Sequence, residues 1–439
     1  MISRATIISV SAIVLIAGHR VPSQAATNRI LRVGGSGDYR ALQDAITDSR
    51  DGDTIQVAQG VYTENIRLAV SKSITIQGGW NFDFSSRVED VSLTVVDGSG
   101  RGSVFEILAN RGVAISISVE SLTIRNGKAA LGAGVNATAI GPNARLTLAL
   151  VRSRITGNAA SGSGGGVYAH TDALGGPAAL VLSAVKNQVD GNTAGDTGGG
   201  FAVGSHAGGQ VQVELTGNLV TGNTAVQSSA GMWFNSDLGG AKTEANLKGN
   251  VISGNSGPQW NGGGVAAYSG ENATTVMVFT DNSIVGNSSG YGGGICLSAQ
   301  NAASTMEATL SRNLIAGNHA SSHFGGLVVT ATDSASTVLQ MSGNTVTQNT
   351  APSSSSGLSV ISGDNQMPLG TDTSQVMAES RDDFIWGNGA PGSAPDLEIW
   401  AYATSDPATV KASFSAFGTV TNHIGVFTPT NCIIGTSRN

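Results

Sequence analysis

The sequence contains little charge. Charged side chains make up 12% of its 439 residues, roughly half the typical share, and the formal net charge is −7. No run of lysine or arginine occurs, which argues against a nucleic-acid partner, because nucleic-acid-binding proteins present basic patches. The 40% share of hydrophobic residues argues against a disordered chain, which has few apolar groups and high net charge.

Cysteine is also scarce. The two cysteines, Cys296 and Cys432, are too few for a disulfide framework. They would pair if the C-terminal tail folded back onto the segment around Cys296. Two free thiols agree with the sequence equally well.

Hydrophobic runs of membrane-spanning length are absent. The longest apolar stretch, Ala5–Gly18, follows Arg4 and precedes a small-x-small site at Ser23–Ala25, which is typical of a signal peptide over residues 1–25 that is cleaved after Ala25. The stretch is too short to cross a bilayer as a stable helix. We therefore expect a secreted protein in the extracellular space, on the cell surface or in the periplasm.

Glycine and asparagine are abundant, and they form a repeat. The phrase Asn-x-x-x-Gly/Gln-Asn and the glycine cluster that usually follows it recur every 31 to 34 residues. Self-similarity at such a period indicates a repeat architecture. The phrase occupies Asn187–Asn192, Asn218–Asn223, Asn250–Asn255, Asn282–Asn287, Asn313–Asn318 and Asn344–Asn349.

Each repeat contains three short strand-like segments, for example residues 166–169, 179–182 and 188–189. One repeat therefore predicts one full coil of a three-sided parallel β-helix, an all-β solenoid of roughly ten coils. Apolar residues after each glycine cluster should stack into its core. Asparagines in register should form a hydrogen-bonded ladder along the rod.

The N-terminal segment predicts a cap for this solenoid. Tyr39, Leu42, Ala45 and Ile46 lie at helical spacing, and Asp38 would be the N-cap residue. A helix there would cover the exposed end of the first coil. We expect the signal peptide at 1–25, the cap and first coil at 26–70, the repeats at 71–360, and the last coils with a C-terminal cap at 361–439.

Two segments resemble known families. Residues 35–65, from Gly-Ser-Gly-Asp-Tyr to Gly-Val-Tyr-Thr-Glu-Asn, look like the entry to right-handed parallel β-helices of the pectin lyase-like superfamily, and pectin methylesterases open similarly. This resemblance implies that the solenoid is right-handed. Residues 130–360 resemble the Gly- and Asn-rich repeats of bacterial surface β-helices, including the polymorphic outer-membrane protein family. Those relatives commonly end in a membrane barrel, for which the roughly 80 residues after the last repeat are too few, so no transmembrane barrel is expected.

One further motif concerns catalysis. The segment from Asp383 to Gly387 reads Asp-Phe-Ile-Trp-Gly and resembles the Asp-Phe-Ile-Phe-Gly motif of pectin methylesterases, which implies Asp383 as a catalytic nucleophile. The family's Gln-Asp-Thr-Leu and Gly-Arg-Pro-Trp segments are missing from this sequence. The alternative is that residues 384–386 form a strand and residues 387–388 one more turn of the repeat.

An acidic row and an aromatic rim are the other candidate sites. Acidic residues follow several glycine clusters by six or seven positions and would bind Ca²⁺ if they lined one corner, whereas solvated turns are the alternative. Their members are Asp172, Asp237, Glu271, Asp333 and Asp364. The rim would stack sugar rings, or else fill gaps between loops. It comprises Trp260, Tyr291, His319, His323 and Phe324 in loops, with Tyr168, Trp233 and Tyr268 on strands.

Two classes of function remain open. The first is a non-catalytic secreted or cell-surface protein that binds an extracellular polysaccharide or cell surface, or serves as a structural spacer. The second is a lyase, hydrolase or esterase acting on an acidic polysaccharide. We favour the first, with no cofactor and no metal at the His319–His323 pair, because no catalytic set is complete and no third ligand is evident.

Overall fold

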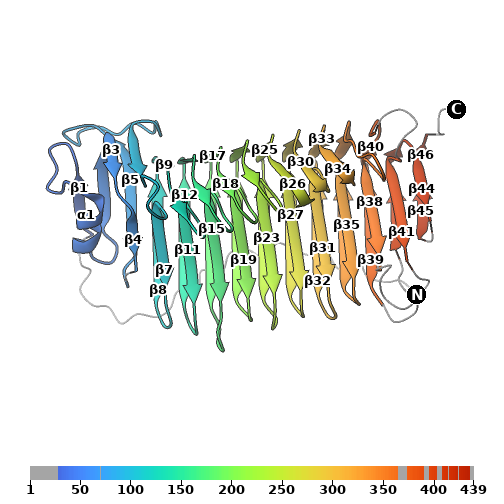
Figure 1. Ribbon diagram of the computed structural model, residues 1–439, viewed down its shortest axis with the longest axis horizontal. Coiled ribbons are helices and arrows are strands. Elements are labelled where there is room, and N and C mark those ends of the chain that lie inside the picture. Colours follow the sequence, from blue (N-terminus) through green and yellow to red (C-terminus); the bar gives the residue numbers. More distant parts are fainter. Residues whose placement is uncertain are drawn as a thin grey trace.

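The computed structural model describes residues 28–69, 71–363, 373–389, 395–402, 408–413, 415–423 and 425–435. The predicted signal peptide and Asp364 lie outside these residues. Parallel strands stack coil upon coil into a rod (Figure 1). This arrangement confirms the predicted right-handed parallel β-helix of about ten coils. Among the described residues, no helix is long and apolar enough to cross a membrane.

Three long parallel sheets form the sides of the rod. Sheet A has 14 strands, sheet B has 13 and sheet C has 12. One coil passes through β15 (Val167–Asp172) in sheet C, β16 (Ala179–Val185) in sheet A and β17 (Gln188–Asp190) in sheet B. These are the three strands that the repeat predicts. The structure adds a seven-stranded sheet D at the corner between sheets B and C, from β10 (Lys128–Ala129) to β34 (His319–His323).

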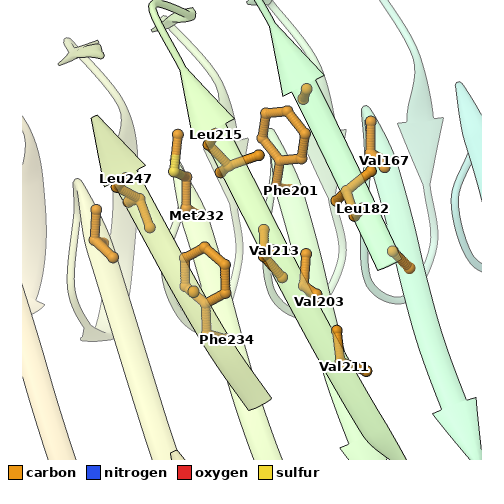
Figure 2. Packing of buried hydrophobic residues seen from close by; sticks show 14 of the residues in the cluster. Val167, Leu182, Phe201, Val203, Val211, Val213, Leu215, Met232, Phe234 and Leu247 are labelled. Atoms are coloured by element: carbon orange, nitrogen blue, oxygen red, sulfur yellow. The ribbon is translucent and has the colours of Figure 1, made fainter. Parts of the chain in front are cut away.

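The core is a continuous stack of inward apolar side chains. Val167, Phe201 and Met232 occupy one register position in sheet C, and all three are fully buried. They face Leu182, Val213 and their neighbours from sheet A (Figure 2). Burying one such side chain contributes about 1.5–3 kcal/mol. Because every coil contributes several of them, core packing gives the rod much of its stability.

Two asparagine ladders run along the corners beside sheet B. In one of them, the main-chain N–H and side-chain Nδ2 of Asn223 both donate to Oδ1 of Asn255, each at 3.0 Å, and Nδ2 also donates to the carbonyl of Val189 at 2.9 Å. The same contacts recur in successive coils, and the ladder residues are buried. The predicted ladder is confirmed.

The glycine clusters lie where sheet D meets sheet C. Gly164 has a φ of +73°, a left-handed conformation that favours glycine. A Cβ atom at Gly165 would lie 2.4 Å from the carbonyl oxygen of Thr193 and 2.6 Å from that of Gly199. Coils approach so closely here that a side chain has no room.

A helix lies at the N-terminal end of the rod (Figure 1). Helix α1 (Leu42–Asp48) buries Leu42, Ala45 and Ile46, three of the four residues predicted for its apolar face. The prediction that Asp38 is the N-cap was wrong, because Ala41 occupies that position and has no capping side chain. The carboxylate of Glu64 instead accepts hydrogen bonds from the N–H groups of Leu42 and Gln43, at 2.8 and 2.9 Å. An acceptor from the first coil thus ties the helix to the solenoid.

Candidate functional site

The outward face of sheet C carries three of the aromatic residues that the sequence predicts for a site, Tyr168, Trp233 and Tyr268. Strands β15, β19 (Phe201–His206), β23 (Met232–Asp237) and β27 (Val265–Gly270) are consecutive neighbours in register. Their first outward column reads Tyr168, Ala202, Trp233 and Ala266. Large aromatic side chains therefore alternate with small ones along this column.

A second outward column reads His170, Gly204, Asn235 and Tyr268. The rings of Tyr168 and His170 stack with centroids 5.5 Å apart and an interplanar angle of 13°. Those of Trp233 and Tyr268 stack at 6.4 Å and 13°. The two columns together form two aromatic pairs that lie on either side of strand β19.

A slot of about 350 Å³ lies above β19, between these two aromatic pairs. Ala202 and Gly204 form its floor. A Cβ atom at Gly204 would lie only 2.8 Å from Oδ1 of Asn235 and 3.3 Å from Cδ2 of His170, so the glycine keeps the floor open. The walls are Tyr168 and His170 on one side and Trp233 and Asn235 on the other, and the rim carries Ser163, Asp196 and Thr197.

The aromatic side of the slot offers hydrogen-bonding groups and carries no charge at neutral pH. Burial, with His206 nearby, lowers the pKa of His170 to about 4, and burial raises the pKa of Tyr168 to about 12. Both rings are therefore neutral at pH 7. On the rim, Ser163 Oγ donates to Asp196 Oδ2 at 3.0 Å, and Thr197 Oγ1 donates to Ser163 Oγ at 3.0 Å.

Lysine and arginine are absent from the strands in this part of sheet C. The eight strands from β11 (Val135–Ile140) to β38 (Leu358–Ser362) contain no lysine or arginine. Asp172 and Asp237 lie in the third outward column, and Asp196 lies on the rim of the slot. The surroundings of the slot are therefore acidic.

The predicted loop aromatics lie on sheet D, where its strands lengthen. Tyr291, at the end of β30 (Ser288–Tyr291), stacks with His323 at 5.2 Å and 5°, and Phe324 lies 6.3 Å from Tyr291. His319 is separate from this group, and its Nδ1 lies 2.9 Å from Thr350 Oγ1. Trp260 lies on β26 (Ser256–Asn261), and its side chain is outside the described part.

A small apolar cluster joins these aromatics to the slot. Ala266, Cys296 and Val328 are buried on the outer side of sheet C, and Trp233 and Phe324 pack against them. The outer face is therefore one band from Tyr168 to Phe324. Trp233 packs against this cluster on one side and forms a wall of the slot on the other.

His170, Gly204 and Asn235 were not among the predicted site residues. Neither were the rim residues Ser163 and Asp196. A signal for the first three was present. Outward positions alternate along each strand after the glycine cluster, and reading the second outward position in each coil gives the second column. The rim residues carried no such signal, because they come from the irregular turn before the cluster.

The acidic residues of the predicted row lie in two different settings. Asp172, His206 and Asp237 are consecutive in one column, with Asp172 Oδ2 at 3.5 Å from His206 Nδ1. Glu271 and Asp333 lie in the turns after their strands, with φ of +45° and +57°. Within the described ranges, no three His, Cys, Asp or Glu side chains gather to hold a metal ion.

Asp383 lies at the end of an asparagine ladder and is only 2% exposed. Its Oδ1 accepts from the N–H of Asn344 at 2.7 Å and from Nδ2 of Asn344 at 2.9 Å. Its Oδ2 accepts from Ser380 Oγ at 2.7 Å and from the N–H of Arg381 at 3.2 Å. Burial raises the pKa of this carboxyl. Both oxygens are engaged inside the rod, which is the arrangement of a repeat turn and offers no access to a substrate.

The two cysteines are both free thiols. Cys296 belongs to the apolar cluster beneath Trp233 and Phe324, where burial raises its pKa to about 12. Cys432 is partly exposed in the last described coil. Cys296 therefore contributes no reactive thiolate to the face of sheet C at neutral pH.

Fold and surface together define the class of this molecule as a parallel β-solenoid with an aromatic outer face. No protein-family model matches the sequence, and no curated protein matches it.

Proposed function

We propose that this protein is a secreted or cell-surface β-helix that binds a polysaccharide without catalysis along the outer face of sheet C. The observation that carries the proposal is the alternation of Tyr168, Ala202, Trp233 and Ala266 in one register column. Aromatic faces with a polar handle suit the apolar faces of sugar rings. Small residues between them leave room for those rings to enter.

The geometry of the rod supports a polymeric ligand. Neighbouring strands of a sheet lie about 4.8 Å apart, so the band from β15 to β35 (Leu327–Thr332) extends over several coils in one direction. A linear polymer can follow such a band, whereas a small metabolite would use only part of it. The predicted signal peptide and the resemblance of residues 35–65 to the pectin lyase-like superfamily support an extracellular, polysaccharide-related role.

The test compares two tryptophan variants. Trp233→Ala removes a wall of the slot, whereas Trp386→Ala removes an exposed tryptophan beside β40 (Phe384–Ile385) in sheet B. Residues 26–439 and both variants would be assayed by affinity electrophoresis through gels containing neutral and acidic polysaccharides. We expect retardation by at least one polysaccharide, its loss in Trp233→Ala, and its retention in Trp386→Ala. Absence of retardation across the panel, or equal loss in both variants, would contradict the proposal.

A polysaccharide hydrolase is the second candidate. Asp172 and Asp237 stand two rungs apart in one column, with His206 between them. Two rungs span about 9.6 Å, close to the upper end of the carboxyl separations used by inverting glycosidases. Release of reducing ends from any retarding polysaccharide, abolished in Asp237→Asn, would replace the non-catalytic proposal with this one.

A further inference from the structure

We infer that the slot above β19 receives a single uncharged sugar ring of the bound polysaccharide and disfavours a uronate. This inference rests on the proposed function, because it names the ligand class of the same face. It is argued from the size of the slot, its polar groups and the charge around it.

The dimensions of the slot suit one ring. Its walls, Tyr168 and Trp233, belong to strands two rungs apart, so the backbones that carry them are about 9.6 Å apart. Its volume of about 350 Å³ is near the lower end of the ~300–1,000 Å³ typical of ligand pockets. A sugar ring can enter between the two aromatic walls, while neighbouring rings of the chain lie over the flanking coils.

The polar groups of the slot suit hydroxyl groups. Asp196 retains an oxygen besides the Oδ2 that accepts from Ser163, and a carboxylate oxygen is a strong acceptor for a sugar hydroxyl. The amide of Asn235 and the neutral imidazole of His170 provide both donors and acceptors. A neutral sugar has donors and acceptors in the same ring and can satisfy all three groups.

The charge around the slot opposes an anion. Asp196 lies on the rim, and Asp172 and Asp237 lie in the next outward column on either side of His206. The eight strands of sheet C from β11 to β38 supply no lysine or arginine. A uronate would place its carboxylate beside these groups without a cation to neutralise it, and leaving such a charge unpaired in a partly enclosed site is unfavourable. The same ring without the carboxylate avoids this cost.

Gly204 provides a direct way to close the slot. Its φ lies outside the left-handed region, so a larger residue needs no strained backbone dihedral, but its Cβ atom would lie 2.8 Å from Oδ1 of Asn235. The Asn235 side chain must therefore shift while the new side chain fills the floor of the slot. Gly204→Val should therefore remove binding to the slot while the solenoid remains folded. Thr138→Val, in the same column on β11, is the control outside the slot.

The experiment compares methyl hexopyranosides with the corresponding methyl hexuronides in the gluco, galacto and manno series. Binding to residues 26–439 would be measured by ligand-observed NMR, and unfolding midpoints would be recorded for each variant. We expect at least one neutral glycoside to bind at least tenfold more tightly than its uronide, to lose binding in Gly204→Val and to keep it in Thr138→Val. In Asp196→Asn the preference for the neutral ring should decrease, which is a readout independent of how well Gly204→Val folds.

The outcomes separate this inference from the proposed function. Equal or tighter binding of the uronide would overturn the inference while leaving glycan binding intact. A second outcome would also overturn the inference while leaving the proposed function intact. In it, retardation by the polysaccharide depends on Trp233 but is unchanged in a folded Gly204→Val variant. Failure of every polysaccharide and glycoside to bind would overturn both.

Discussion

The asparagine ladders and the outer face of sheet C follow the same coils, yet they differ in how strictly they repeat. The ladder through Asn223 and Asn255 has asparagine in each successive coil from Asn158 to Asn388. The first outward column of sheet C changes residue type at almost every coil. The strictly repeated positions are those of the scaffold, and the variable positions form the candidate site.

The reason for this difference is physical. Each ladder asparagine accepts two hydrogen bonds from the coil before it and donates two to the asparagine of the coil after it, so replacing one leaves buried groups of its neighbour unpaired. An outward side chain of sheet C does not have to supply hydrogen bonds to the next coil. It can therefore vary with the ligand without cost to the fold.

The largest effect should come from breaking the ladder. Asn255→Ala leaves the N–H and Nδ2 of Asn223 without their acceptor in a buried site, and each unsatisfied buried group costs about 1–3 kcal/mol. We expect a loss of roughly 3 kcal/mol, measured as a lower urea midpoint by circular dichroism. The control is Asn246→Ala, whose side chain bonds Glu214 on the outer side of sheet A and should change stability by about 0.5 kcal/mol or less. Equal shifts in the two variants would show that the ladder is no more important than a surface amide.

The ladder and the core could be predicted from the sequence because they repeat. The asparagine phrase recurs in each coil, and so do alternating apolar residues such as Val167 and Ala169. Their structural roles can therefore be recognised from the sequence. The slot could not be predicted, because it depends on Gly204 and Ala202 replacing larger residues in one coil and on Ser163 and Asp196 reaching its rim from a turn. For Asp383 the sequence suggested a site where the structure has scaffold. A local resemblance implied a catalytic role, whereas the residue occupies the next position of an asparagine ladder.

The next effect concerns the face of sheet C. Trp233→Ala should weaken polysaccharide binding about tenfold, which corresponds to ~1.4 kcal/mol, because it removes one wall of the slot. Its cost to stability should stay below about 1 kcal/mol, since the ring is only partly buried, against Tyr268 and the small cluster of Ala266, Cys296 and Val328. Titration of the retarding polysaccharide and a urea denaturation curve on the same sample would measure both. A loss of stability as large as that of Asn255→Ala would remove the distinction between face and ladder.

A smaller effect on stability should appear at the end of the second asparagine ladder, where the carboxylate of Asp383 takes the place of an asparagine amide. Burial raises the pKa of Asp383 in the folded state, so its contribution to stability is fully present below the unfolded pKa, near 4, and is lost as pH rises through the higher folded pKa. The difference in urea midpoint between wild type and Asp383→Asn should therefore shift in favour of wild type as pH falls from 7 to 4. A difference that is constant with pH, or that shifts toward the variant, would contradict this assignment.

The smallest effect should have the opposite sign, because it comes from the surface of the rod. Asp281 lies in an exposed turn, where Arg312 Nε and Nη2 donate to its two oxygens at 2.7 and 3.0 Å. The hydrogen bond from Arg312 lowers the pKa of this carboxyl, so its contribution is present above the unfolded pKa and is lost as pH falls through the lower folded pKa. Between pH 5 and pH 2.5, wild type should lose a small advantage over Asp281→Asn. Added salt should reduce that advantage, because exposed ion pairs are screened, whereas the buried Asp383 should respond little. Two aspartates three coils apart in one solenoid would then titrate in opposite senses, because one is buried at the end of a ladder and the other is exposed and paired with Arg312.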